Sequence, residues 1–156
     1  MGQCSRRFPS TGVRGGAKLE RVALLDSAAP PSLSFTSDTT KLAVCRLDAE
    51  EPIPAWATAG PWWTVSHTQS ELSIVCEEGR VPEGVAKTGP WRALQVAGTL
   101  DHQLVGILAS ITATLAASQV PIFAVSTYDT DWVLVPEDRF ERACSALVGA
   151  GHQFDP

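Results

Sequence analysis

Residues 91–154 decide the fold, and they read WRALQVAGTLDHQLVGILASITATLAASQVPIFAVSTYDTDWVLVPEDRFERACSALVGAGHQF. Near the start, Leu94 and Val96 fall on one face by period-two alternation, which predicts a strand over residues 91–98. Between residues 104 and 117 the apolar positions recur at helical spacing, and Pro121 lies just beyond them. The positions that form this stripe are Leu104, Ile107, Leu108, Ile111 and Leu115. A helix is therefore expected here.

The second part of this stretch predicts a hairpin, a helix and an edge strand. Residues 122–126 and 132–135 are two strand candidates around the polar linker 127–131. Pro136 suits the first turn of a last helix, and Gly149 and Gly151 would end it. Its expected apolar stripe consists of Phe140, Cys144, Leu147 and Val148. With a final strand over residues 152–154, the order matches the ferredoxin-like βαββαβ unit.

The preceding residues look like a shorter version of the same unit. Residues 42–47 predict a strand, and the proline-punctuated residues 50–57 suit only a short helix. A hairpin is expected from residues 62–66 and 71–76, followed by a Gly/Pro/Glu connector over residues 77–90. The predicted fold class is α+β, with antiparallel sheets covered by helices on one face.

Three segments are expected along the chain. Residues 32–90 would form the first, shorter unit, and residues 91–156 the second. Residues 1–31 mix Gly, Ser, Pro and Arg without periodicity, so we expect a mobile tail that carries no site. Within it, the apolar residues 22–25 could dock on the core as a short helix or strand.

Composition excludes several classes of partner. The chain has 156 residues, of which 44% are hydrophobic, and no apolar run approaches the roughly 18 residues of a membrane span. A membrane is therefore not expected as a partner. The formal charge of -5 disfavours a basic surface that would bind the phosphates of a nucleic acid, so a nucleic acid is not expected either. The four cysteines show no CxxC spacing, which favours reduced, buried thiols in a cytoplasmic protein.

Three strings narrow the choice of function: SHTQSELSIVCEE (66–78), GTLDHQLVGILASITATLA (98–116) and VSTYDTDWVLVPED (125–138). Together they resemble the CASTOR-like ACT-domain family, over about residues 42–147. The resemblance implies tandem ACT units that bind a free amino acid as a regulatory sensor. It also implies a homo-oligomer or a contact between tandem ACT units, and a binding protein rather than an enzyme. No cofactor is expected, and no metal site is expected because the three histidines, His67, His102 and His152, lack the short spacing of a zinc site.

The resemblance also implies where the ligand would bind. A free amino acid presents an ammonium, a carboxylate and a side chain, so its site needs acceptors and amide donors together. Backbone N–H groups at the start of the predicted helix would hold the carboxylate, with Gly106 leaving space. Hydroxyls and carboxylates of residues 126–131 would edge the pocket, provided that the strand over residues 122–126 is the sheet neighbour of residues 91–98.

Eleven residues are expected to bind the ligand: Asp101, Leu104, Val105, Gly106, Ile107, Leu108, Ser126, Thr127, Tyr128, Thr130 and Asp131. Asp131 stands where a carboxylate contacts the ligand in the family's arginine sensors. Those sensors carry an acidic residue just before the glycine turn, where this chain has Leu104 beside Gln103. Arginine is therefore doubtful, and a smaller or less basic amino acid becomes as good a candidate.

Plainer interpretations exist for the same residues. Asp129 and Asp131 could simply make a hairpin turn, and Gly106 could serve only close helix packing. Trp62 and Trp63 would point to opposite faces of a strand, with one ring in the core or capping a pocket.

Two other functions remain open, a structural interaction module without ligand and a small hydrolase. Ser66 with His67, and Asp101 with His102, supply the residue types of a hydrolytic triad, but no GxSxG elbow is present.

Overall fold

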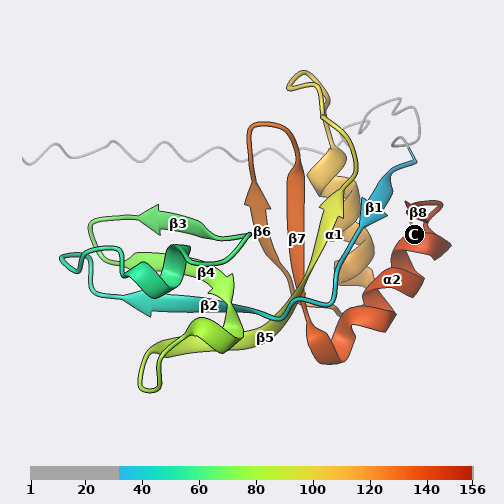
Figure 1. The fold of residues 1–156 in the computed structure, drawn as a ribbon. Helices are drawn as coiled ribbons and strands as arrows, with labels where there is room; N and C mark the ends of the chain where they lie inside the picture. Colours follow the sequence, from blue (N-terminus) through green and yellow to red (C-terminus); the bar gives the residue numbers. More distant parts are fainter. Residues whose placement is uncertain (1–31, 156) are drawn as a thin grey trace, which may run out of the picture.

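The computed structural model describes residues 32–155 and shows an α+β fold, an eight-stranded sheet with two α-helices (Figure 1). The strands are β1 (Ser34–Thr36), β2 (Leu42–Leu47), β3 (Thr64–His67), β4 (Leu72–Glu77), β5 (Ala86–Val96), β6 (Phe123–Ser126), β7 (Asp131–Pro136) and β8 (Gln153–Phe154). The helices are α1 (Ile107–Ala117) and α2 (Phe140–Gly149), and the 3-10 turns are η1 (Ala55–Thr58), η2 (Glu78–Arg80) and η3 (Glu137–Arg139). The expected α+β class is confirmed.

Strand β5 joins the two halves of the molecule, as Figure 1 shows. Its first part pairs with β2, and its second part pairs with β7 on one edge and with β1 on the other, always antiparallel. The N-terminal half consists of β2, β3 and β4 with the start of β5, and the C-terminal half contains the remaining strands and both α-helices. Because β5 runs through residue 90, the two predicted units share this strand.

The connector predicted over residues 77–90 is wrong in its second part, because β5 already begins at Ala86. Gly89 and Pro90, the Gly/Pro end of the expected connector, form a bulge within β5, because these two residues lie opposite the single residue Ala43 of β2, between the pairs Leu42–Trp91 and Val44–Thr88. A Cβ atom at residue 89 would come 2.9 Å from the carbonyl oxygen of Leu42. Glycine therefore permits the close approach of the two strands, and pairing with β2 overrides the local turn signal.

In the C-terminal half the strand order is β8-β1-β5-β7-β6, and the elements from β5 to β8 follow the predicted βαββαβ order. The neighbour of β5 is β7, so the expectation that residues 122–126 pair directly with residues 91–98 is wrong. β7 carries three consecutive buried residues, Val133–Val135, which suits the inner position. β6 has a shallower, alternating burial pattern and lies outside it.

Strand β1 was not predicted, and it changes the edge of the sheet. It inserts between β5 and β8, so β8 pairs in parallel with β1. Phe35 in β1 is fully buried, stacks on Phe154 at 5.5 Å between ring centroids and meets His152 edge-on at 5.7 Å. The expected edge strand over residues 152–154 is confirmed, with β1 as its partner.

Both helices cover one face of the C-terminal half (Figure 1) and bury Ile111, Leu115 and Leu147 against Leu94 and Val96 of β5. α1 starts at Ile107, three residues later than the stripe suggested, because Leu104 lies in the preceding loop. Val148 was predicted on the buried stripe of α2 but is 55% exposed.

Ala143 takes the place expected for Val148, since the buried face of α2 follows positions 140, 143, 144 and 147. A small residue at position 143 lets α2 approach the sheet closely.

The thiols of Cys45 and Cys76 are buried and free, as predicted, whereas Cys144 is half-buried and Cys4 lies outside the described residues. Burial raises the pKa of Cys45 to about 11 and also raises that of Cys76. Both groups are therefore protonated thiols at neutral pH and poor nucleophiles. The predicted tail, residues 1–31, also falls outside the described part, which contains no helix of the length and hydropathy needed to cross a membrane.

His152 makes the stability of the C-terminal half depend on pH. Its side chain is buried, its Nδ1 accepts a hydrogen bond from the backbone N–H of Leu33 at 3.2 Å, and burial lowers its pKa. The unfolded chain, with an ordinary histidine pKa of about 6.5, then binds more protons than the folded chain. The stability that the neutral, buried His152 contributes is therefore fully present above about pH 6.5, and it is lost as the pH falls through the lowered pKa of the folded chain.

Urea unfolding between about pH 5 and 8 should therefore show the free energy of unfolding falling toward pH 5. The variant His152→Gln keeps an acceptor for Leu33 but cannot titrate, so its curve should be flatter over the same range. Identical pH dependence in both proteins would show that His152 does not couple protonation to folding.

Candidate functional site

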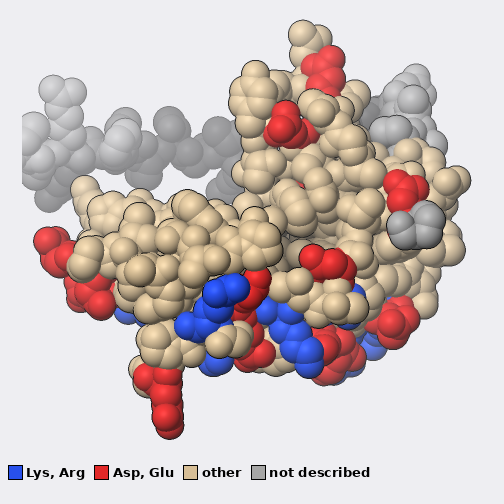
Figure 2. Space-filling view, in the orientation of Figure 1, with Lys and Arg blue, Asp and Glu red and all other residues tan. Residues whose placement is uncertain are grey.

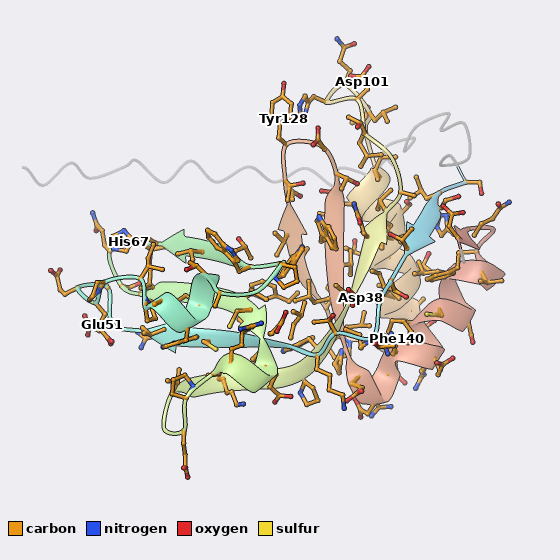
Figure 3. All side chains as sticks on the ribbon, in the orientation of Figure 1. Asp38, Glu51, His67, Asp101, Tyr128 and Phe140 are labelled. Carbon is orange, nitrogen blue, oxygen red and sulfur yellow. The ribbon has the colours of Figure 1, made fainter. Side chains whose placement is uncertain are left out.

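A pocket of about 180 Å³ lies at one end of the C-terminal half, between the loop that precedes α1 and the turn that joins β6 to β7. Figure 3 shows Asp101 and Tyr128 side by side at this end, one from each segment. Eight of the eleven predicted residues line it: Asp101, Leu104, Ile107, Ser126, Thr127, Tyr128, Thr130 and Asp131. Asp129, expected at the edge, also lines it, whereas Leu100 and His102 were not predicted.

One wall of the pocket is the N-terminal end of α1. Gly106 occupies the N-cap with a left-handed φ of 85°, and no side chain caps this end of the helix. A Cβ atom at residue 106 would meet nothing within 4 Å, so the backbone conformation, and not close packing, requires glycine there. The backbone N–H groups of the first turn are thus available to an anionic group.

Three predicted residues do not line the pocket in this structure. Val105 is 93% exposed, and Gly106 is the N-cap residue of α1. Leu108 instead packs against the hydrophobic core beneath the helices.

The opposite wall is a tightly held turn. The backbone N–H and the hydroxyl of Thr127 both donate to the carbonyl oxygen of Thr130, at 2.9 and 2.7 Å. Thr130 is buried, and its hydroxyl donates to the carbonyl oxygen of Val96 at 2.7 Å. The backbone N–H of Leu100 donates to the carbonyl oxygen of Asp129 at 2.8 Å and ties the two loops together. The threonines thus fix the shape of the wall.

Asp131 begins β7 and lies opposite Ser126 of β6. Its carboxylate accepts a hydrogen bond from the Ser126 hydroxyl, which leaves the second carboxylate oxygen for another donor. The turn between the two strands is closed by Thr127 and Thr130. Asp131 is therefore not the residue that closes this turn.

The pocket is acidic. The carboxylates of Asp101, Asp129 and Asp131 line it, and no lysine or arginine is among its described lining residues. Figure 2 shows the same distribution, with red and no blue atoms over this end of the molecule in that view. At the mouth, the rings of His102 and Tyr128 meet edge to face at 5.0 Å between centroids. Such a pocket favours a positively charged group on the ligand.

The candidate residues of a hydrolytic triad do not come together. Figure 3 shows His67 in the N-terminal half and Asp101 at the far end of the C-terminal half. The Nε2 atom of His67 lies 3.0 Å from the carbonyl oxygen of Ala49, a local contact within its own half. Ser66 and His67 therefore form no site with Asp101 and His102.

Two family models match consecutive parts of this chain. A family model described as ACT domain matches residues 88–148, and a second model, described as an N-terminal domain, matches residues 40–84. Protein Atu0741 from Agobacterium tumefaciens, whose crystal structure is known, is 33% identical to this chain in sequence. The two structures superpose with a TM-score of 0.76, and the match covers 80% of this chain and 93% of Atu0741.

Two further solved structures share the fold at lower identity. The Vibrio cholerae protein VC0802, described as a possible transport protein, is 17% identical, with a TM-score of 0.64 over 76% of this chain and 90% of that one. The aspartate kinase of Clostridium acetobutylicum, described as an allosteric enzyme, is 15% identical, with a TM-score of 0.59 over 78% of this chain and 35% of that one. At these identities the likeness concerns the fold.

Proposed function

Because this chain carries an ACT domain and belongs to the family of Agobacterium tumefaciens protein Atu0741, we propose that it is a regulatory protein that binds a free amino acid and catalyses no reaction. The observation that carries the proposal is the pocket between the uncapped start of α1 and the turn before Asp131. It offers backbone donors on one wall and a carboxylate on the other, the two groups that a zwitterion needs.

In the proposed complex, the ligand carboxylate binds the N–H groups of the first turn of α1, beyond Gly106. The partial positive charge of the helix end favours an anion there, and no lysine or arginine of the described lining competes for it. The ligand ammonium donates to Asp131. The pocket volume of about 180 Å³ is below the roughly 300 Å³ at which drug-sized sites begin, which suits a molecule as small as an amino acid.

The side chain of the ligand lies toward Leu104 and Ile107 in this arrangement. Both are apolar and line the pocket, so they favour a ligand side chain with carbon atoms near its base. The surrounding carboxylates disfavour aspartate and glutamate by like-charge repulsion. The proposed ligand is therefore a neutral or weakly basic amino acid.

Assembly is the second part of the proposal. The rim of the pocket carries three exposed apolar side chains, Leu104 at 51%, Val105 at 93% and Tyr128 at 82% exposure. Exposed apolar and aromatic side chains that lie together are typical of a surface that another protein covers. A second copy of this chain on the rim would make ligand binding and assembly affect each other, which is how a sensor transmits occupancy.

Titration calorimetry of the full chain against each common amino acid tests the proposal. One or a few should bind, and the N-acetyl and amide forms of the best ligand should not, because each lacks one of the two charged groups. Light scattering of the same samples should show a dimer or larger assembly whose stability changes with the ligand. A folded protein that binds no amino acid would instead favour an interaction module without ligand.

A further inference from the structure

A second cavity, of about 230 Å³, lies on the sheet face opposite the helices. Leu94 and Val96 of β5 point to the helix side, so the alternate residues Ala93 and Gln95, which line this cavity, point to the other side. The remaining walls come from the loop between β1 and β2, from Trp62 before β3, and from Trp132 on β7. It shares no lining residue with the amino-acid pocket.

Two tryptophans form an aromatic wall of this cavity. The rings of Trp62 and Trp132 lie 5.3 Å apart between centroids at an interplanar angle of 53°, and both are half-buried. Trp132 is also the β7 partner of Gln95, so the sheet fixes its position. The face of an indole ring carries partial negative charge and attracts cations.

Asp38 is the one charged residue among the described residues that line the cavity. Its Oδ1 atom accepts a hydrogen bond from the backbone N–H of Thr40 at 2.8 Å, which orients the carboxylate and leaves Oδ2 for another donor or cation. Arg92, outside the lining, donates from Nε to the carbonyl oxygen of Asp38 at 2.9 Å and lies 3.9 Å from the ring centroid of Phe140. Figure 3 shows Asp38 close to Phe140, where the two halves meet.

We propose that this cavity is a second ligand site, which binds a small organic ammonium cation with its charge between the tryptophan wall and Asp38. The aromatic faces and the carboxylate both favour a positive charge, and the apolar walls favour a group with carbon attached to the nitrogen. The volume of about 230 Å³ is below the roughly 300 Å³ at which drug-sized sites begin, which suits a molecule of about the size of choline. Hydroxyls of Thr36 and Thr40 can meet a polar substituent.

The test uses choline and its uncharged isostere 3,3-dimethylbutan-1-ol as probes on the full chain, at constant ionic strength. Nuclear magnetic resonance of the assigned indole N–H groups should show saturable shifts for Trp62 and Trp132 with choline, and binding at least fivefold weaker with the alcohol. Trp62→Leu should weaken choline binding about tenfold, and Asp38→Asn about threefold.

Matched control variants test whether choline binds at this cavity and not elsewhere on the protein. Trp63→Leu changes an exposed neighbouring ring that does not line the cavity, and Glu83→Gln removes an exposed carboxylate elsewhere, so both should leave choline binding unchanged. Asp131→Asn should also leave it unchanged, because Asp131 lines the other pocket. Shifts that do not saturate, equal binding of the alcohol, or unaltered binding in a folded Trp62→Leu protein would each overturn the proposal. If Trp62→Leu does not fold, the alcohol comparison and Asp38→Asn still decide it.

Discussion

Replacing Phe35 by Ala is expected to lower the free energy of unfolding by about 3 to 5 kcal/mol, the usual cost of removing a fully buried aromatic ring. Phe35 is 0% exposed and contacts the rings of His152 and Phe154, and its strand β1 pairs with both β5 and β8. Loss of the ring would leave a cavity among β1, β8 and the helices. Urea unfolding monitored by tryptophan fluorescence measures the change.

Phe123→Ala is the matched control for this prediction. Phe123 lies on the edge strand β6 and is only half-buried, so the same truncation should cost clearly less. If Phe35→Ala costs no more than Phe123→Ala, then β1 is not an integral part of the core, and β8 would have to be held in another way.

Replacing Asp131 by Asn should weaken binding of the amino acid about tenfold to a hundredfold. The change keeps the size of the side chain but removes the charge that we assign to the ligand ammonium, and a hydrogen bond to a charged group contributes about 1.5 to 3 kcal/mol. The fold should be retained, because an Asn carbonyl oxygen can still accept the hydrogen bond from Ser126. Calorimetry with the best ligand gives the affinity, and thermal unfolding gives the stability.

Asp138→Asn serves as the control, since Asp138 pairs with Arg139 and lies outside the pocket. It carries the same change of charge and should leave the affinity unaltered. An Asp131→Asn protein that is less stable yet binds the amino acid normally would mean that Asp131 only supports the hairpin.

Local patterns predicted most of the regular elements. The helical stripe of residues 107–115 was found where periodicity placed it, because burial on one face of a helix imposes that periodicity directly. The strand over residues 42–47 and the buried run of β7 were found from short apolar runs, since strands covered on both faces show no alternation. Short or interrupted elements were missed. β1 has three residues, too few for a pattern, and the start of β5 was hidden by Gly89 and Pro90.

The candidate site, too, was predicted in part from local patterns and in part decided by the tertiary structure. The sequence by itself determined which two segments carry donors, hydroxyls and carboxylates, since glycine before a helix and a polar linker between strands are local features. Only the tertiary structure decided that these segments meet, through the pairing of β5 with β7 and the hydrogen bond from Leu100 to Asp129. Trp62 and Trp132 are brought together in the same way, because contacts between distant residues depend on strand order, which no local period encodes.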